Sequence, residues 1–326
     1  MKLNATYIKI RDKWWGLPLF LPSLILPIFA HINTFAHISS GEVFLFYLPL
    51  ALMISLMMFF SWAALPGITL GIFVRKYAEL GFYETLSLTA NFIIIIILCW
   101  GGYRVFTPRR NNVSHGDSRL ISQRLFWQIV FPATLFLILF QFAAFVGLLA
   151  SRENLVGVMP FNLGTLINYQ ALLVGNLIGV PLCYFIIRVV RNPFYLRSYY
   201  SQLKQQVDAK VTKKEFAIWL LALGALLLLL CMPLNEKSTI FSTNYTLSLL
   251  LPLMMWGAMR YGYKLISLLW AVVLMISIHS YQNYIPIYPG YTTQLTITSS
   301  SYLVFSFIVN YMAVLATRQR AVVRRK

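Results

Sequence analysis

The chain has 326 residues, of which 59% are hydrophobic and only 11% are charged. A soluble globular domain is roughly half apolar and a quarter charged, so this composition excludes water as the main solvent and makes the lipid bilayer the expected partner. The formal net charge of +18 does not require nucleic acid, because Lys and Arg accumulate in the cytoplasmic loops of membrane proteins. We expect no nucleic-acid partner.

Apolar runs long enough to cross a bilayer, which takes about 20 helical residues, recur along nearly the whole chain. They predict an all-α polytopic membrane protein, a bundle of about ten transmembrane helices with some short or broken by proline. The third segment is too short to span alone, so it is either a half-helix or the partner of the second segment in a bent pair. In chain order the segments are 15–36, 43–60, 65–74, 86–106, 126–150, 165–190, 216–234, 245–259, 263–280 and 295–316.

The basic residues indicate how these segments are threaded. With an even number of crossings and a cytoplasmic N-terminus, nearly all of the 27 Lys and Arg residues fall on cytoplasmic loops. The acids divide almost evenly between the two sides, and a bias confined to Lys and Arg is what membrane insertion produces. We predict a multi-pass protein of the bacterial inner membrane with both termini in the cytoplasm. The basic residues left on the outer side are Arg75, Lys76, Arg152 and Lys237.

Three parts of the chain differ in character. Residues 1–316 form the integral membrane domain, and residues 317–326 continue its last segment as a basic cytoplasmic stub to which an output domain would attach. Within the domain, residues 191–215 form a cytoplasmic connector whose apolar side chains recur at near-heptad spacing with cations between them. This pattern favours an amphipathic helix on the membrane surface, with a solvated charged connector as the alternative. The apolar positions are Leu196, Tyr199, Leu203, Val207 and Val211.

Two GxxxG spacings and a proline lie inside apolar segments. The missing glycine side chains let neighbouring helices approach closely, and proline frees a backbone carbonyl. We interpret these residues as helix-packing positions, while the same spacing leaves a homodimer open. They are Gly67, Gly71, Gly175, Gly179 and Pro181.

Amide and imidazole side chains within the segments are costly in lipid, so they either bond a neighbouring helix or line a site. Bonding between helices is the commoner outcome. If the bundle holds a ligand pocket, we expect these side chains to line it, with one arginine as an anchor at its cytoplasmic end. The candidate ligand-binding residues are Asn91, Asn168, Asn176, His279 and Arg260.

The sequence carries no Ser-His-Asp, HExxH, Walker or Gly-rich phosphate signature. Its three cysteines lie in apolar segments without metal-ligand spacing. Carboxylates, which a proton-coupled pump would place within the membrane, are missing from the middle of every segment. We therefore predict no catalytic residue, no metal and no cofactor.

Four stretches together resemble the MASE-type membrane-associated sensor domain of the first class, and the likeness covers essentially the whole chain. The family often has an acidic residue at the position of Asn176. The sequence is also similar to the N-terminal membrane half of an enterobacterial cyclic-di-GMP phosphodiesterase, in which cytoplasmic GGDEF-like and EAL domains follow. The four stretches are 47–52 (YLPLAL), 65–71 (LPGITLG), 175–181 (GNLIGVP) and 252–262 (PLMMWGAMRYG).

This resemblance implies a membrane-embedded sensory or regulatory input module of bacterial signalling, with a cytoplasmic output domain fused to it or supplied in trans. The chain contains no EAL or GGDEF motif, so we expect the sensor region alone or a truncated form, without catalysis of its own. A small-molecule transporter or channel is the alternative, because broken helices and buried amides also suit substrate passage. The lack of intramembrane carboxylates and of a duplicated half argues against it.

Overall fold

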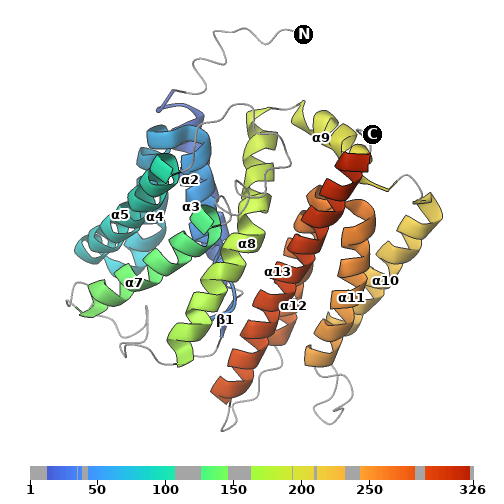
Figure 1. Cartoon of the computed structure of the whole chain (residues 1–326). Helices are drawn as coiled ribbons and strands as arrows, with labels where there is room; N and C mark the ends of the chain where they lie inside the picture. The colour runs from blue at the N-terminus through green and yellow to red at the C-terminus, as the bar shows by residue number, and fades with distance from the viewer. Residues whose placement is uncertain are drawn as a thin grey trace. The chain divides into compact units, whose positions relative to one another are not determined.

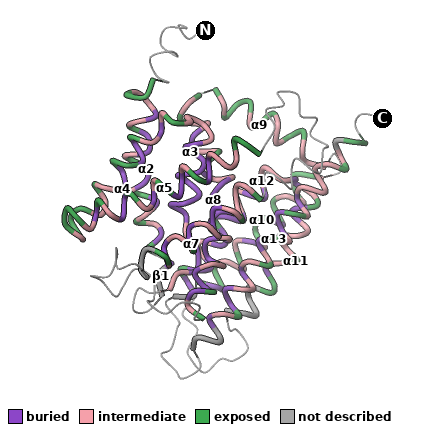
Figure 2. Tube along the Cα trace, turned by 60° about the vertical axis from the view of Figure 1, so that its left-hand side comes forward, coloured by how far each residue is buried: buried purple, intermediate pink, exposed green. Residues whose placement is uncertain are grey.

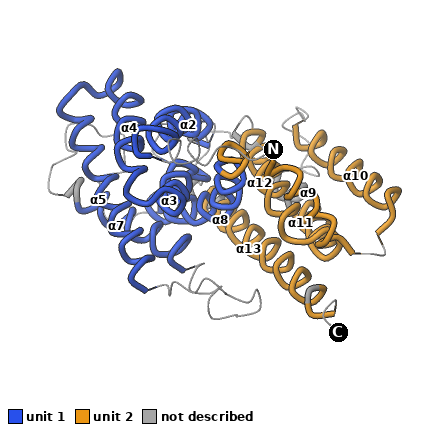
Figure 3. Tube along the Cα trace, turned by 90° about the horizontal axis from the view of Figure 1, so that it is seen from above, with its two compact units in different colours: residues 1–187 blue, residues 188–326 orange. Residues whose placement is uncertain are grey.

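The computed structural model describes residues 13–34, 36–38, 43–106, 126–145, 163–192, 194–208, 211–231, 243–282 and 291–323. Its packing divides the chain into two compact units, residues 1–187 and residues 188–326 (Figure 3). The described residues of both units are almost entirely helical (Figure 1). In each unit the buried positions lie along the sides on which its helices meet (Figure 2).

Seven helical stretches of the described residues are long and apolar enough to cross a membrane, and Phe126–Phe142 is a shorter apolar helix. They fall on the predicted segments, which confirms an all-α multi-pass membrane fold. One of them, Leu48–Leu80, contains the third predicted segment and the second from residue 48 onward. The seven are Leu17–Thr34, Leu48–Leu80, Phe82–Phe106, Leu163–Arg191, Lys213–Cys231, Tyr263–Ser280 and Leu295–Arg320.

Unit 1 holds most of the N-terminal elements. A short antiparallel ribbon of two strands joins its first two helices, with His37 paired to Phe44. The elements are α2 (Leu17–Thr34), β1 (His37–Ile38), β2 (Val43–Phe44), α3 (Leu48–Phe60), η1 (Ser61–Ala64), α4 (Leu65–Leu80), α5 (Phe82–Phe106), the π-helical turn η2 (Phe126–Val130), α7 (Phe131–Phe145) and α8 (Leu163–Arg191), whose last turn passes into unit 2.

The second and third predicted segments are two separate helices. α3 begins beside the end of α2, where the Leu48 N–H donates a hydrogen bond to Asn33 Oδ1 at 3.2 Å. The helix ends at Phe60. The next residue, Ser61, has a φ of 53° in the left-handed region, a conformation that interrupts a right-handed helix. After this break the chain turns through η1 into α4.

α4 runs parallel to α2 and therefore opposite to α3. A Cβ atom on Gly67 would lie 2.6 Å from Leu19 O, and one on Gly71 would lie 3.2 Å from the Leu26 side chain. The contacts advance along both helices in the same direction. The third segment is thus a full helix of 16 residues that follows α2 along its length.

α3 is the central helix of unit 1, because every residue from 48 to 57 is buried. A helix that is apolar on all sides is expected to be enclosed by others. α8 packs along it in parallel: Gly175 lies against the backbone of Tyr47, and a Cβ on Gly179 would be 2.6 Å from Ala51 Cβ. α8 continues as one helix through Pro181.

α5 and α7 form an antiparallel pair joined by aromatic side chains. The centre of the Phe92 ring lies 5.4 Å from that of Phe136 in a tilted arrangement and 5.3 Å from that of Phe140 in an edge-to-face arrangement, which is favourable for aromatic rings. Phe136 also meets Tyr47 at 5.5 Å. The pair is therefore packed beside the start of α3.

Unit 2 consists of helices connected by short turns where the structure describes them. Trp219 Nε1 donates to Leu253 O at 3.0 Å, and Trp270 Nε1 donates to Ser306 Oγ at 2.9 Å. Both indoles are buried, so each donor needs such an acceptor. The elements are α9 (Tyr195–Gln206), α10 (Lys213–Cys231), α11 (Thr243–Tyr261), α12 (Tyr263–Gln282) and α13 (Tyr291–Val323).

Candidate functional site

Polar residues gather in unit 2 where α11 turns into α12. The turn is made by Gly262, whose φ of 80° favours glycine. A Cβ at this position would lie 3.1 Å from both Gln206 O and Thr317 Oγ1. The end of α9, the turn, and α13 therefore meet at Gly262. We call this group the turn cluster; its members are Tyr199, Gln202, Gln206, Asp208, Arg260, Gly262, Lys264, Thr317 and Arg320.

Lys264, in the first turn of α12, holds α9 through three groups. Its backbone N–H donates to Gln206 Oε1 at 3.0 Å, and its carbonyl accepts from the Tyr199 hydroxyl at 2.7 Å. Its ammonium donates to Gln202 Oε1 and lies 5.6 Å from the centre of the Tyr199 ring. Burial raises the pKa of Tyr199, so the hydroxyl stays protonated as the donor this arrangement requires.

Arg260, at the end of α11, binds the segment that follows α9. Its guanidinium donates to Asp208 Oδ2 at 3.2 Å and lies 3.6 Å from Glu215 Oε1, while its carbonyl accepts from the Asp208 N–H at 3.0 Å. All three charged side chains are about one-third exposed. Such ion pairs contribute modestly to stability, so they position the segment more than they stabilise the fold.

The last helix is attached to the same group. Thr317 Oγ1 accepts from the Tyr263 N–H at 2.9 Å and donates to Ala313 O at 2.7 Å. One turn later, the Arg320 guanidinium donates to the carbonyl of Gln206. A displacement of α13 along or about its axis would therefore change its contacts with both α9 and α12.

In unit 1, two of the predicted amides lie on α8 with different partners. Asn168 Oδ1 accepts from the Phe44 N–H at 3.1 Å, which fastens the ribbon to α8. Asn176 is fully buried and donates to Ile129 O, in the π-helical turn η2, at 3.2 Å. Among the described residues its Oδ1 has no hydrogen-bond partner. π-Helical turns are often found at functional sites.

The five predicted ligand-binding residues are divided between the two units, three in unit 1 and two in unit 2. Asn91 is half-buried on α5 of unit 1. In unit 2, His279 is exposed near the end of α12, about 22 Å along the helix from Lys264 at 1.5 Å per residue. Arg260 lies in the turn cluster at the start of that helix. Asn168 and Asn176 share α8 and have different hydrogen-bond partners.

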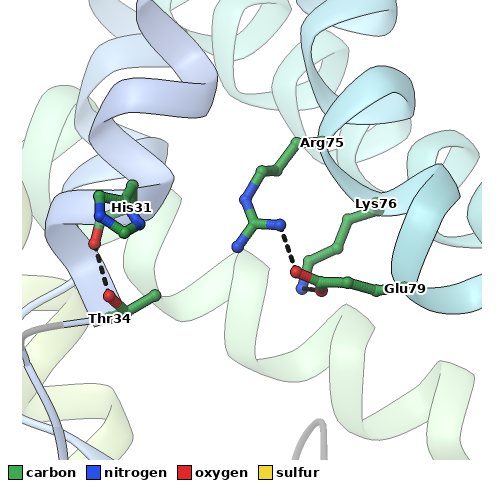
Figure 4. Close-up of polar contacts among 5 residues, drawn as sticks. All are labelled: His31, Thr34, Arg75, Lys76 and Glu79. Atoms are coloured by element: carbon green, nitrogen blue, oxygen red, sulfur yellow. Dashed lines mark hydrogen bonds and ion pairs between the residues drawn. The ribbon is translucent and has the colours of Figure 1, made fainter.

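Two of the cations predicted on the outer side lie together at one end of unit 1. Arg75 and Lys76 both bind Glu79, Lys76 Nζ at 2.5 Å from Glu79 Oε2. The end of α2, with Thr34 donating to the His31 carbonyl at 2.7 Å, lies beside them (Figure 4). The carboxylate offsets part of this positive charge. Arg152 and Lys237 lie outside the described residues.

Within the part of the chain that the structure describes, no three His, Cys, Asp or Glu side chains are grouped so that they could hold a metal ion. Of the turn cluster, sequence reasoning named only Arg260 as a site residue. Gln206 and Thr317 were missed because each is an ordinary polar residue near a helix end. The signal that could have found them is Gly262, the glycine between two apolar segments.

Comparison with known proteins gives one family match and two relatives. The MASE1 family profile matches residues 15–320. The chain is 98% identical over 325 residues to cyclic di-GMP phosphodiesterase PdeF of Escherichia coli K12, covering 100% of this chain and 44% of that protein. It is 23% identical over 305 residues to the protein named probable cyclic di-GMP phosphodiesterase PdeA of the same organism, covering 91% of this chain and 40% of that protein. The chain thus spans less than half the length of these relatives, and no solved structure matches it.

Proposed function

Because this chain belongs to the MASE1 family, we propose that it is the membrane-embedded input module of a bacterial signalling protein and that its output is cyclic-di-GMP hydrolysis in a cytoplasmic domain. The family match runs from residue 15 to residue 320, so the membrane domain occupies nearly the whole chain, and the chain itself contains no catalytic domain. Two relatives named as phosphodiesterases, each more than twice the matched length, support a fused output domain.

The observation that carries the proposal is the attachment of α13 to the turn cluster. Thr317 and Arg320 tie the last helix to α12 and to α9. A change in packing within unit 2 would therefore alter the position of the helix that leads toward any downstream domain. Such a module needs two helix packings of similar free energy, and a stimulus that stabilises one of them more than the other.

We place the turn cluster at the cytoplasmic face of the bacterial inner membrane. The basic residues support this orientation, because the loops at this end of the helices carry the Lys and Arg excess that membrane insertion directs inward. Both termini are then cytoplasmic. Both GxxxG pairs pack against helices of the same chain, so the module does not need a homodimer through them.

For the stimulus we propose unit 1 and, within it, Asn176. Its buried Oδ1 without a partner is a group that a hydrogen-bond donor on a ligand or a rearranged helix could satisfy. Asn168, in contrast, already accepts a backbone donor. Asn91, His279 and Arg260 are not needed for this proposal.

The test joins the chain to the cytoplasmic part of PdeF and measures cyclic-di-GMP hydrolysis in membrane vesicles. Arg320→Gln removes the contact between α13 and α9, and we expect a several-fold change in hydrolysis at equal membrane abundance. Lys213→Gln is the matched control, because it removes the same charge from an exposed position at the same end of unit 2. Equal activity of Arg320→Gln and the parent fusion would refute transmission through the turn cluster. A reporter at residue 326 that is active only in the periplasm would refute the orientation.

A further inference from the structure

The surface helix α9 presents three different sides. One side is half-buried and faces the α11–α12 turn through Tyr199, Gln202 and Gln206. Each residue of a helix is rotated by about 100° from the one before it. Counted from Tyr199, one flank carries Leu196 and Tyr200, and the opposite flank carries the polar Ser198 and Gln205. The exposed large apolar residues of α9 therefore lie on one side of the docked face only.

The apolar flank is exposed and is bordered by cations. Leu196 and Tyr200 expose 51% and 61% of their surface. Arg197 and Lys204 lie next to them around the helix, about 40° to 60° further from the docked face. The Lys204 ammonium is 4.8 Å from the centre of the Tyr200 ring. An apolar stripe therefore runs directly beside a basic stripe.

The charge on this helix is uncompensated along its own sequence. No acidic residue occurs between Arg188 and Val207, and the next one, Asp208, is paired with Arg260. α9 also lies level with the ends of α11 and α12, since its docked face contacts their turn. A membrane-spanning helix ends at the boundary between hydrocarbon and headgroups, so α9 lies in the headgroup layer.

We propose that this flank of α9 is a binding surface for anionic lipid headgroups. Leu196 and Tyr200 enter the interface beside the bundle, and Arg197 and Lys204 bind phosphate groups at the depth where cations and aromatic rings are both favoured. An acidic protein surface would match the cations, but it would not account for an apolar stripe on the flank alone. The proposal requires only that unit 2 spans a membrane and is independent of the signalling role.

The experiment reconstitutes the full chain in nanodiscs of phosphatidylcholine, with or without phosphatidylglycerol, and follows amide hydrogen exchange in residues 195–206. Each cation near an anionic surface contributes about a factor of five to binding. We therefore expect exchange of α9 to be slower by up to roughly 25-fold in the anionic discs, and high salt to reduce the difference.

Arg197→Gln combined with Lys204→Gln should abolish this lipid dependence, whereas Arg75→Gln combined with Lys76→Gln, the same loss of charge in unit 1, should preserve it. Exchange in α12 and α13 shows in the same samples whether a variant is folded. Equal exchange of α9 in the two lipids, or an undiminished difference in the Arg197/Lys204 variant, would overturn the proposal. So would protection of α9 that appears in the fusion with the cytoplasmic part of PdeF irrespective of lipid, because it would identify a protein as the occupant.

Discussion

Tyr263 and Thr317 are 54 residues apart in the chain, yet the backbone N–H of Tyr263 donates a hydrogen bond to Thr317 Oγ1 across 2.9 Å. The first amide donors of a helix have no partner inside it. Tyr263 is the first residue of α12, so the cap that a helix normally receives from its own N-terminal residues is supplied here by α13. The first turn of α12 therefore depends on the position of α13, because one hydroxyl group of α13 supplies its cap.

Replacing this hydroxyl should destabilise unit 2. Thr317→Val keeps the shape of the side chain but leaves the partly buried Tyr263 N–H without its acceptor, which costs about 1 to 3 kcal/mol. The free energy of unfolding, measured by SDS titration in mixed micelles, should fall by that amount. Thr69→Val is the control: Thr69 is exposed and only donates to Leu65 O one turn earlier, so its loss should cost less than about 0.5 kcal/mol. Equal losses for the two variants would contradict a capping role.

A second prediction separates backbone strain from packing at the α11–α12 turn. Gly262 and Gly81 have nearly the same positive φ, 80° and 78°, and a non-glycine residue in such a sparsely populated region costs about 1 to 3 kcal/mol. A Cβ on Gly81 meets nothing within 4 Å, whereas one on Gly262 lies 2.9 Å from Gln206 Cβ. Gly262→Ala should therefore lower the free energy of unfolding more than Gly81→Ala does.

The extra loss in Gly262→Ala should be accompanied by faster amide exchange in α9, because the added methyl group pushes against Gln206. Gly81→Ala should leave exchange in α9 as it is in the parent chain. If both variants lose the same free energy and α9 is unaffected, the close approach of α9 to the turn does not contribute to stability.

The sequence was sufficient to predict where the helices lie but not which polar contacts they make. Apolar length predicted where α2, α5, α8 and α12 lie, because a segment that must cross hydrocarbon has to satisfy its own backbone as a helix. It did not resolve whether residues 65–74 form a full helix. That outcome depends on the reversal of the chain at Ser61. A residue with positive φ is usually glycine, so a serine at this position gave no sign of the reversal.

The candidate site was predicted far less well, for a physical reason. A buried amide in a sequence is compatible both with bonding a neighbouring helix, the commoner outcome, and with lining a pocket, and only its partner in the structure distinguishes the two. Asn168 turned out to accept a backbone donor. Arg260 was chosen as an anchor, but its partners Asp208 and Glu215 lie on other segments, and spacing along one chain does not reveal such pairings.

A third prediction concerns the contact between α3 and α8. A Cβ on Gly175 would collide with the backbone of Tyr47, and backbone cannot move away as a flexible side chain can. Gly175→Ala should lower the free energy of unfolding by at least about 1 kcal/mol. Gly101→Ala, also within a helix but with nothing within 4 Å of its Cβ, should instead raise it by up to about 1 kcal/mol, because alanine favours helix. Opposite signs are expected, and a Gly175→Ala variant that is as stable as the parent chain or more stable would argue against the close packing of α3 and α8.

The last prediction distinguishes the two amides of α8. Asn168→Leu leaves the Phe44 N–H without an acceptor, so it should cost about 1 to 3 kcal/mol. Asn176→Leu removes one bond, to Ile129 O, but also removes a buried oxygen that has no partner among the described residues. The two effects oppose each other, so we expect a change in the free energy of unfolding within about 1 kcal/mol.

The same pair of variants, joined to the cytoplasmic part of PdeF, shows whether Asn176 does more than pack. If the buried oxygen serves the stimulus, Asn176→Leu should change cyclic-di-GMP hydrolysis while its stability and membrane abundance stay close to those of the parent. Asn168→Leu should change hydrolysis only in proportion to its lower abundance. An Asn176→Leu fusion that is as unstable as Asn168→Leu, or as active as the parent, would show that the amide only bonds α8 to η2, because a group kept for sensing must alter the output when it is removed without unfolding the helices around it.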